Sequence, residues 1–555
     1  MKPFRIVIFS SMLPSHPQQF LWRLSADLPQ VVVAGVLYET KRRQLSRRER
    51  VKRAVKLSRD PDFIGYSVDK VRRQFRIRLE HLLDRLLRML HAAPENSNRL
   101  SLSLIQLKEI CKAKGIAFEI TNDIHSEASL EFVRSLGADL GVIYGTRILK
   151  PQLFSIPRLG SINIHKHKVP EYRGSGAPGI WEMRDGKTEQ GVTVHRVLKE
   201  VDAGGVVGEQ SFSIEPFDTL TSVGLKADLV GFDCLIDVIG RASRGVWEET
   251  PQASQGTVYK GFQPHQFWAI EREILKKRKP FKPVTGRPLH KLVPRMLTYP
   301  ALYFRNRRRA RTKNFPVVIL YHHLVTDRPM YMGLSTEQFF KHIRYLKKHY
   351  RIASLPEAMD MLHKGEVSEP TVVLTFDDGY RDNFICLRAV VEAENVPVTL
   401  FVCTDNIAKG SPFQHDLDRK ELGFPPMTWD QVRYFDHHGV TIGSHTRTHF
   451  DCGSTDEAKL TSEIVGSLDD LRKELGHDVF YFSFPWGHPQ NMSNEARRIA
   501  AETYSYVFSA FGGVSYGPLG RNTVIKRYGH PASLVELELL LQGVLDWDWK
   551  LRKNG

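Results

Sequence analysis

Two separate polar motifs, one in each half of this chain, indicate two sites that need separate cores. The first is Asn163-Ile-His165 and the second is Thr375-Phe-Asp377-Asp378-Gly379. Polar residues at the carboxyl ends of buried strands are typical of α/β domains. A chain of 555 residues is also too long for a single hydrophobic core. We therefore expect two or three domains of the α/β class.

The N-terminal half alternates between apolar runs and helical stretches. Residues 4–10 and 31–38 read as buried parallel strands around a helix, and strands resume at 116–120 and 140–144. A helix near 126–136 separates the last two. This βαβ alternation predicts an open, Rossmann-like parallel sheet. No GxGxxG motif opens it, which argues against a nicotinamide dinucleotide fold.

The C-terminal half shows the same alternation with different spacing. Strand-like runs occur at 317–321, 371–376, 398–402 and 440–444, and a helical stretch follows each. This pattern predicts a β/α barrel. We place the domain boundaries at 1–262 and 316–555, and we see no internal repeat of short period.

The net charge of +17 is concentrated in two segments. Lys41–Arg88 holds 17 basic and 6 acidic residues, and Phe262–Phe315 holds 15 basic and 2 acidic residues. These excesses of +11 and +13 leave −7 for the rest of the chain. The segments can meet phosphates of nucleic acid, acidic lipid or nucleotide substrates, or they can simply be solvated surface.

The two basic segments differ in pattern. Residues 41–91 predict a helical insertion in the first domain, with leucines recurring at helical spacing beside arginines. Residues 263–315 predict a linker or surface-binding element, because Pro294 and Pro300 interrupt any long helix. Its aromatic patch beside a cationic cluster suits the surface of an anionic membrane.

Several classes of protein are disfavoured. The five cysteines are scattered without a CxxC, which excludes a disulfide framework and a cysteine zinc site. No run approaches the roughly 18 apolar residues of a membrane span. The N-terminal apolar run stops at Ser10 and lacks the core of a signal peptide. We expect a cytoplasmic protein, with any membrane contact peripheral and at the inner face.

The first motif has the residue types that acyl transfer to an amine requires. Asn163 can donate to a tetrahedral oxyanion, and His165 can manage the proton of the amine. The two residues point to the same side if the strand continues this far. Asp202, in Val201-Asp-Ala-Gly-Gly205, can raise the pKa of the imidazole and help relay the proton through water.

Residues 161–208 resemble the formyltransferases that use 10-formyltetrahydrofolate, and the resemblance covers about 1–262. It implies that Asn163, His165 and Asp202 form a catalytic triad. It also implies a folate pocket lined by Tyr144, Gly145, Thr146, Ile148 and Leu149. After the histidine the family usually has Ser-Leu-Leu-Pro, whereas this chain has Lys166-His-Lys-Val-Pro170.

One segment favours a particular branch of that family. Gly256-Thr-Val-Tyr-Lys-Gly-Phe-Gln-Pro264 looks like the corresponding segment of sugar N-formyltransferases. The tRNA enzymes continue instead into a small basic β-rich domain. The proline-interrupted basic stretch that follows here favours the sugar branch.

The second motif has the residue types of a catalytic divalent metal site. Two histidines and one carboxylate with open positions can hold a metal that activates water, and a nearby carboxylate can act as base. His445 and His449 would share a face if their loop is helical. Asp377 and Asp378 are adjacent, so one can bind metal while the other serves as base.

Residues 316–540 resemble the NodB-type polysaccharide deacetylases of carbohydrate esterase family 4. The resemblance implies a distorted β/α barrel, Asp378, His445 and His449 as ligands of a divalent metal such as zinc, and Asp377 as general base. Where the family usually has Arg-x-Pro-Tyr, this chain has Ser483-Phe-Pro-Trp. Support for the catalytic aspartate must then come from elsewhere.

Other histidines of the second half are secondary candidates. His530 is the first candidate for the general acid, with His488 behind it. His322 and His323 can line the barrel mouth or pack in the core.

Together the motifs predict a bifunctional enzyme that deacetylates an amino sugar and formylates the exposed amine. The expected substrate is a nucleotide- or lipid-linked precursor of a cell-surface glycan. The alternatives are a formyltransferase paired with a deformylase on a lipid-linked amino sugar, and an RNA-associated formyltransferase. Nucleic acid is not the expected partner, because no recognisable nucleic-acid module is present. The oligomeric state stays open.

Overall fold

A computed structural model of the chain divides it into two compact units. The first comprises Met1–Leu79 and Ser101–Pro280, and the second Glu80–Leu100 and Phe281–Gly555. The described residues are 2–40, 61–88, 104–252, 256–260, 263–277, 298–328, 332–420, 424–520, 523–529, 531 and 533–544.

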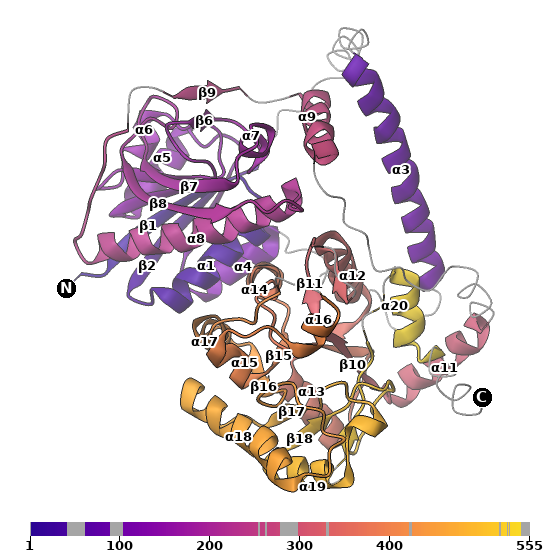
Figure 1. Ribbon diagram of the computed structural model, residues 1–555. Helices are drawn as coiled ribbons and strands as arrows, with labels where there is room; N and C mark the ends of the chain where they lie inside the picture. The colour runs from indigo at the N-terminus through magenta and orange to yellow at the C-terminus, as the bar shows by residue number, and fades with distance from the viewer. Residues whose placement is uncertain are drawn as a thin grey trace. The chain divides into compact units, whose positions relative to one another are not determined.

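The first unit, drawn in indigo to magenta in Figure 1, is built on a seven-stranded sheet. The strand order is β3-β2-β1-β4-β5-β7-β8. Strands β1 to β5 pair in parallel, as the sequence predicted, whereas β7 and β8 extend the edge antiparallel. A separate pair joins β6 to β9. The strands are β1 (Phe4–Ser10), β2 (Val31–Glu39), β3 (Ala117–Thr121), β4 (Leu140–Tyr144), β5 (Ser161–His165), β6 (Tyr172–Gly174), β7 (Glu189–Arg196), β8 (Val206–Ser213) and β9 (Thr257–Tyr259).

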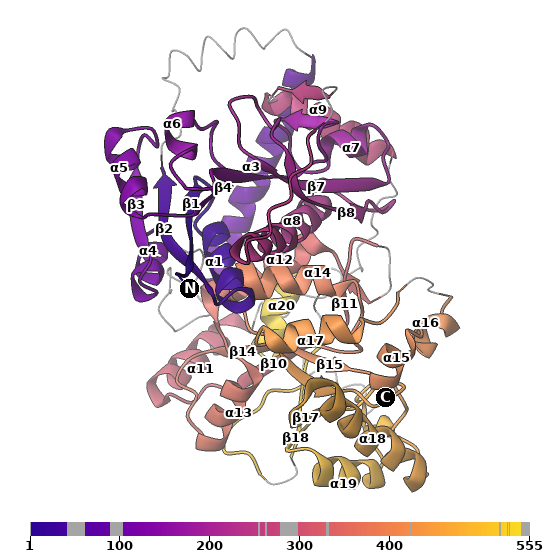
Figure 2. The same ribbon diagram turned by 90° about the vertical axis from the view of Figure 1, so that its left-hand side faces the viewer.

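Helices cover both faces of this sheet (Figure 2). Ile6 and Ile8 of β1 pack with α1, α4 and α8, while Val7 and Phe9 pack with α5 and α6. This alternation follows from the two-residue period of a strand. The helices are α1 (Ser15–Asp27), α4 (Leu104–Ala113), α5 (Glu127–Ser135), α6 (Pro151–Phe154), α7 (Ile180–Arg184), α8 (Leu220–Ser243) and α9 (Pro264–Lys277).

The two basic segments contain helices. The predicted insertion contains α3 (Pro61–Arg88). Gly65 of α3 packs closely against the ring of Trp268 on α9, since a Cβ atom added at this glycine would lie 2.6 Å from that ring. The predicted linker holds α9 at its start and α11 (Tyr299–Thr312) near its end, with Pro300 in the first turn of α11. A proline there costs no helical hydrogen bond.

The second unit carries an all-parallel sheet with the order β10-β14-β15-β16-β17-β18-β19, and β13 pairs with β14. Tyr528, just after β19, exchanges backbone hydrogen bonds with Ile319 and Tyr321 of β10, so the sheet curls back toward its first strand. The predicted distorted barrel is confirmed as this curled sheet. The strands are β10 (Val317–His322), β11 (Leu324–Val325), β12 (Gly333–Leu334), β13 (Arg351–Ile352), β14 (Thr371–Phe376), β15 (Thr399–Val402), β16 (Thr441–Ser444), β17 (Tyr481–Ser483), β18 (Tyr506–Phe508) and β19 (Val524–Ile525).

Helices follow most of these strands, and α18 and α19 lie side by side in both views (Figures 1 and 2). Besides α11, the helices of this unit are α12 (Thr336–His349), α13 (Leu355–Lys364), α14 (Asn383–Arg388) with a π-helical continuation (Ala389–Ala393), α15 (Thr404–Lys409), α16 (Gln414–Asp418), α17 (Trp429–His437), α18 (Glu457–Leu475), a 3₁₀ turn (Pro489–Asn491), α19 (Asn494–Thr503) and α20 (Leu534–Leu541).

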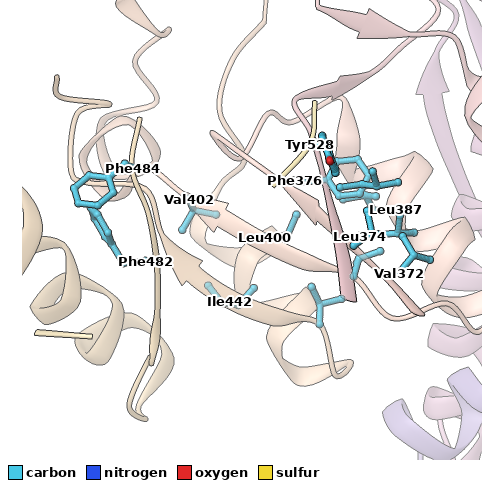
Figure 3. Close-up of a cluster of buried hydrophobic side chains, with 14 of the residues drawn as sticks. Val372, Leu374, Phe376, Leu387, Leu400, Val402, Ile442, Phe482, Phe484 and Tyr528 are labelled. Atoms are coloured by element: carbon cyan, nitrogen blue, oxygen red, sulfur yellow. The ribbon is translucent and has the colours of Figure 1, made fainter. Parts of the chain in front are cut away.

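The two faces of the curled sheet bury different residues. Leu374 and Phe376 of β14 join the large cluster between strands and helices, which Figure 3 shows running across to Phe482 on β17. Val373 faces the smaller cluster on the other side. Thr375 and Asp377 continue that second face by the same alternation, so β14 delivers Asp377 into the interior of the curl.

The structure also bears on disulfides and on membrane-spanning helices. All five cysteines are buried free thiols. Among the helices of the described residues, none has both the length and the apolar character needed to cross a membrane.

Candidate active sites

In the first unit, β5 and β7 bring together Asn163, His165, His195 and Asp202, which we call the Asn163 site. Asn163 and His165 lie two residues apart on β5, and Asn163 stands directly opposite His195 of the antiparallel strand β7. Asp202 lies between β7 and β8 with a φ of 49°, a left-handed conformation that non-glycine residues rarely adopt. Strain at this position is typical of a functional residue.

Hydrogen bonds connect these side chains. Nδ2 of Asn163 donates to Nε2 of His195 at 3.2 Å and lies 3.5 Å from Oδ1 of Asp202. The backbone N–H of Gly174 donates to Oδ2 of Asp202 at 2.9 Å. Nε2 of His165 donates to the carbonyl oxygen of Tyr172 at 2.6 Å, and its Nδ1 lies 3.6 Å from Oδ2 of Asp202.

Burial sets the charge states. Burial lowers the pKa of His165 to about 4, although the nearby Asp202 acts in the opposite direction. Burial would raise the pKa of Asp202, but the neighbouring imidazoles of His195 and His165 bring it down to about 2. At neutral pH the imidazole is therefore neutral and the carboxylate ionised. Asp202 raises the pKa of the His165 imidazole, as expected, but desolvation lowers that pKa by more.

A cavity of about 480 Å³ opens beside this site. Its size falls in the range of small-molecule pockets. It lies at the carboxyl ends of β4 and β5, where open α/β sheets bind ligands. The residues expected around folate all line it: Tyr144, Gly145, Thr146, Ile148 and Leu149. A pterin-sized donor therefore fits the residues present.

The unusual loop after His165 does not leave its lysines available to an anion. Lys166 forms an ion pair with Asp228, and its ammonium lies 5.6 Å from the centre of the Tyr144 ring. Lys168 pairs with Glu209 at 3.2 Å. Both positive charges are therefore compensated within the unit.

In the second unit, Asp378, His445 and His449 form a buried cluster, which we call the Asp378 site. Their candidate ligand atoms all lie within 4.8 Å of one another. Oδ1 of Asp378 lies 3.4 Å from Nε2 of His445 and 3.3 Å from Nε2 of His449. Nδ1 of His445 donates to the carbonyl oxygen of Ser483 at 2.7 Å, which turns Nε2 toward the cluster.

The backbone brings these residues together in an unexpected way. The segment from His445 to His449 is a turn and not a helix, so the expected shared helical face is wrong. The two histidines converge because Thr446 and His449 have φ values of 66° and 57°. Asp378 also has a positive φ, 70°. Three strained non-glycine residues around one cluster are typical of a site preserved for function.

The cluster fits a divalent metal. Both carboxylate oxygens of Asp378 are buried, and they accept no hydrogen bond from the described residues. A buried carboxylate without hydrogen bonds is costly unless a cation compensates it. Two imidazoles and one carboxylate with open positions are a donor set that zinc accepts in catalytic sites.

Arg527 supplies the support that Ser483 was expected to lack. Its Nη1 and Nη2 donate to the two oxygens of Asp377 at 2.7 Å each. Nη2 also donates to Oγ of Ser483 at 2.6 Å, Nη1 to Oγ1 of Thr375 at 2.9 Å, and Nε to the carbonyl of Ser509 at 3.0 Å. All five N–H donors of this fully buried guanidinium are used.

This ion pair sets the charge of Asp377. Burial alone would raise the pKa of its carboxyl, but the adjacent Arg527 guanidinium and His445 hold it below the usual value. Asp377 therefore stays ionised at neutral pH, buried and held in one orientation.

The secondary histidine candidates lie in different surroundings. His322 packs in the core, with its ring stacked 5.0 Å from that of Phe376. His323 lies near enough to Asp377 and Asp378 to influence both carboxylates. His488 precedes the 3₁₀ turn after β17. His530 lies outside the described residues.

Sequence reasoning missed another histidine at the Asp378 site. Nε2 of His415 lies 3.9 Å from Oδ2 of Asp378, and the ring centres of His415 and His449 are 4.6 Å apart. The hydroxyl of Tyr380 lies 2.9 Å from His415 Nε2 and donates to Asp416 at 2.8 Å. No local pattern around residue 415 signals this, because tertiary folding of the α16 region creates the contact.

Two protein families match the chain. Residues 101–239 match the formyl transferase family, and residues 364–506 match the polysaccharide deacetylase family. The predicted pair of families is confirmed, in the predicted order.

Curated relatives match the first unit only in part. A methionyl-tRNA formyltransferase from Thermotoga maritima is 29% identical over 155 residues, which is 28% of this chain and 49% of the relative. The enzyme of the same name from Staphylococcus aureus is 35% identical over 124 residues, 22% of this chain and 40% of the relative. The chain spans about half the length, or less, of these relatives.

Solved structures resemble each half. IcaB from Ammonifex degensii aligns with a TM-score of 0.35 and 20% identity, over 41% of this chain and 97% of its own. A sugar N-formyltransferase from a Shewanella species aligns with a TM-score of 0.29 and 14% identity, over 46% of this chain and 76% of its own.

Proposed function

We propose that this chain is a bifunctional enzyme that modifies an amino sugar. The second unit removes an N-acyl group by metal-dependent hydrolysis, and the first unit places a formyl group on the exposed amine. The formyl donor is 10-formyltetrahydrofolate, and the substrate is a nucleotide- or lipid-linked precursor of a cell-surface glycan. The observation that carries the proposal is the buried Asp378 site with the ionised Asp377 beside it, in one chain with the Asn163 site.

In the hydrolytic half, the residues of the Asp378 site hold a divalent metal, with zinc as our first candidate. When bound, it supplies Lewis acidity to the amide carbonyl and to a water. Asp377 accepts the proton of that water, because Arg527 keeps its carboxylate ionised and fixed. Trp486 is 43% exposed and its ring centre lies 4.4 Å from that of His449, so its face can stack on a sugar ring at the site.

In the transfer half, the Asn163 site stabilises charge and moves a proton. During transfer, Nδ2 of Asn163 gives up its long contact with Asp202 and donates a hydrogen bond to the developing oxyanion. Nδ1 of His165 faces Asp202 across 3.6 Å, so a proton taken up there is stabilised by the carboxylate. His195 holds the amide of Asn163 in place.

The proposed setting is the cytoplasm, since folate donors and activated sugars are found there. A peripheral contact with an anionic membrane is part of the proposal, because α11 exposes 68% of Phe304 beside a run of arginines. Flotation of the full chain with neutral and with anionic vesicles tests this contact.

The test separates the two half-reactions with site variants of the full chain. A His165→Ala chain should hydrolyse nucleotide-linked N-acetylhexosamines to free amines without formylating them. An Asp377→Asn chain should formylate the corresponding free amines without hydrolysing the acetamides. Mass spectrometry of the products reads both outcomes. Hydrolysis of N-formyl but not N-acetyl substrates would instead favour the formyltransferase–deformylase pair.

A second candidate acceptor is an aminoacyl-tRNA, because the curated relatives above are methionyl-tRNA formyltransferases. Formylation of initiator methionyl-tRNA, with binding that falls steeply as salt rises, would favour it. We rank it second because the Asp378 site has no place in that reaction.

A further inference from the structure

A second cavity of about 580 Å³ lies in the first unit, lined by the insertion helix α3 and by α9, and we call it the α3 cavity. Its size is that of a small-molecule pocket. The two catalytic motifs of the sequence contribute no residue to it. Its lining comes from two helices and one loop: Tyr66 and Arg73 of α3, Phe267, Trp268 and Glu271 of α9, and residues 175–177.

The start of α3 is packed against α9 by close contacts (Figure 1). A Cβ atom at Gly65 would lie 2.6 Å from the ring of Trp268, so only a glycine allows this approach. The rings of Phe63 and His265 meet edge to face, with their centres 5.8 Å apart. Glycine is unfavourable inside a helix, and the close packing accounts for its presence here. The wall of the α3 cavity is therefore held by specific contacts.

The α3 cavity adjoins the cavity of the Asn163 site, because one loop lines both. Ser175 and Gly176 belong to the lining of each cavity. They follow Gly174, whose backbone N–H donates to Oδ2 of Asp202. Both shared residues are exposed, so a ligand can lie over them. A molecule bound at the Asn163 site can therefore extend past this loop into the α3 cavity.

The aromatic lining of the α3 cavity suits a flat ring. Tyr66 on α3 and Phe267 on α9 are only partly buried, so each presents part of its side chain to the cavity. Nucleobases stack on aromatic side chains of this kind without needing a particular base. A base carried by the acceptor would find such a surface here.

Glu271 adds a hydrogen-bond acceptor to this lining. Nη2 of Arg73 lies 3.9 Å from Oε2 of Glu271, which is beyond hydrogen-bonding distance, and Nε of Arg73 bonds to Asp69 at 2.6 Å. Partial burial raises the pKa of Glu271, and Arg73 opposes that effect. A carboxylate short of water gains from a donor such as a ribose hydroxyl. Because two carboxylates already compensate Arg73, the cavity favours an uncharged group over a phosphate.

We propose that the α3 cavity is a subsite for the acceptor of formyl transfer and holds the nucleoside of a nucleotide-linked amino sugar. This inference rests on the proposed formyl transfer, and it selects the nucleotide from the two carriers considered there. The amino sugar occupies the Asn163 site, and the diphosphate passes over Ser175 and Gly176. The base stacks on Tyr66, and Glu271 accepts hydrogen bonds from the ribose. The insertion helix thereby takes part in selecting the acceptor.

The decisive variants each remove one contact and have a matched control on the same helix. Tyr66→Ala removes the stacking ring, and its control is Phe75→Ala, because Phe75 is 69% exposed and does not line the cavity. Glu271→Gln keeps the shape of the side chain and removes its charge, and its control is Glu273→Gln at an exposed position of α9. Both changed positions are partly exposed, so the fold tolerates these substitutions.

Two measurements on the full chain read the subsite. Calorimetry measures the binding of uridine, thymidine, cytidine and guanosine diphosphates, and formylation assays use the corresponding nucleotide-linked aminohexoses and aminohexose 1-phosphate. We expect at least one nucleoside diphosphate to bind. Its Kd, and the KM of the matching acceptor, should rise about 10-fold or more in Tyr66→Ala and in Glu271→Gln. Both controls should stay within about twofold of wild type, and formylation of aminohexose 1-phosphate should be unchanged in every variant.

The outcomes separate this inference from the proposed function. Nucleoside diphosphate binding that depends on Tyr66, without formyl transfer to any amine, would keep the nucleoside site and overturn the proposed function. Formyl transfer to nucleotide-linked sugars with unchanged KM in both Tyr66→Ala and Glu271→Gln would overturn the subsite and keep the function. A wild-type chain that binds no nucleoside diphosphate, but formylates a polyprenyl diphosphate-linked glycan in a Tyr66-dependent way, would overturn the nucleoside and assign the cavity to a sugar residue.

Discussion

The guanidinium of Arg527 holds the carboxylate of Asp377 by two parallel hydrogen bonds of 2.7 Å, deep inside the second unit. The two residues are 150 positions apart in the chain. Ser483, where the deacetylase pattern usually has the arginine, accepts a hydrogen bond from the same guanidinium. A positive charge therefore lies beside the proposed base, but it comes from Arg527 after β19 and not from position 483 on β17.

Replacing Arg527 by lysine should lower N-deacylation about 10²-fold, because a point charge cannot fix both oxygens and a displacement of about 1 Å has that cost. The Michaelis constant and metal content should change little, since Arg527 touches neither ligand nor substrate in the proposed arrangement. Arg527→Met should also cost about 3–5 kcal/mol of unfolding free energy, because it leaves Asp377 buried and unpaired.

Arg498→Lys is the matched control for these variants, since Arg498 is an exposed residue of α19 that pairs with glutamates on the surface. A chain with Ser483→Arg and Arg527→Ser places the arginine where the family usually has it and should regain part of the rate. Unchanged hydrolysis in Arg527→Lys would show that Asp377 is not the base.

Removing the metal should stop hydrolysis and leave formyl transfer intact. Chelation of the full chain, or His449→Ala, should lower the metal content per chain and abolish N-deacylation, because the remaining two ligands bind zinc much more weakly. His477→Ala is the control, since His477 is half exposed and bonded to Asp436. Element analysis and the two separate rate assays measure this. Metal retained at full stoichiometry in His449→Ala would contradict the assigned ligand set.

Asp202→Asn should impair formyl transfer and leave N-deacylation intact, the reverse of the effect of metal removal. It preserves shape but removes the charge that faces His165 and His195, so formyl transfer should fall about 10²–10⁴-fold. N-deacylation by the same chain should be unchanged. Glu209→Gln, which affects only the ion pair with Lys168, is the control. Equal loss of both activities would indicate damage to the fold and not to a catalytic group.

His342 should make the second unit sensitive to mild acid. Its ring is buried on α12, neither nitrogen is hydrogen-bonded within the described residues, and burial lowers its pKa to about 4. The unfolded chain takes up this proton near pH 6.5 and the folded chain does not, so stability falls as pH drops below that value. At pH 5 the loss is about 2 kcal/mol from this residue alone.

His342→Leu should therefore raise the melting temperature, and the gain should be larger at pH 5 than at pH 7.5. His363→Leu, at an exposed histidine of α13 bonded to Tyr506, is the comparison. Melting curves of the two variants at both pH values test this. A gain for His342→Leu that does not depend on pH would contradict the assigned titration.

The sequence predicted the parts of the fold that local patterns encode. The run Thr371–Phe376 is β-branched and apolar, and it forms β14 as expected. Asn163 and His165 alternate on one strand, so their common side followed from the two-residue period. These inferences need only a few consecutive residues.

Long-range contacts could not be predicted in this way. His195 joins the Asn163 site only because β7 pairs antiparallel with β5 in one particular register. Arg527 reaches Asp377 only because the last strand of the curled sheet returns toward the first. The turn at Thr446 depends on a left-handed conformation, which a pattern of two histidines spaced four apart does not reveal. Each of these depends on tertiary packing.

The most direct test of the central claim follows a labelled formyl group through the complete reaction. The purified full chain is incubated with zinc, ¹³C-formyl-labelled 10-formyltetrahydrofolate and nucleotide-linked N-acetylhexosamines. The account predicts free acetate and a sugar product that carries the ¹³C-formyl group on nitrogen, with free amine accumulating when Asp202→Asn is used. Formylation of the free amines while every N-acetyl substrate remains intact would contradict the account.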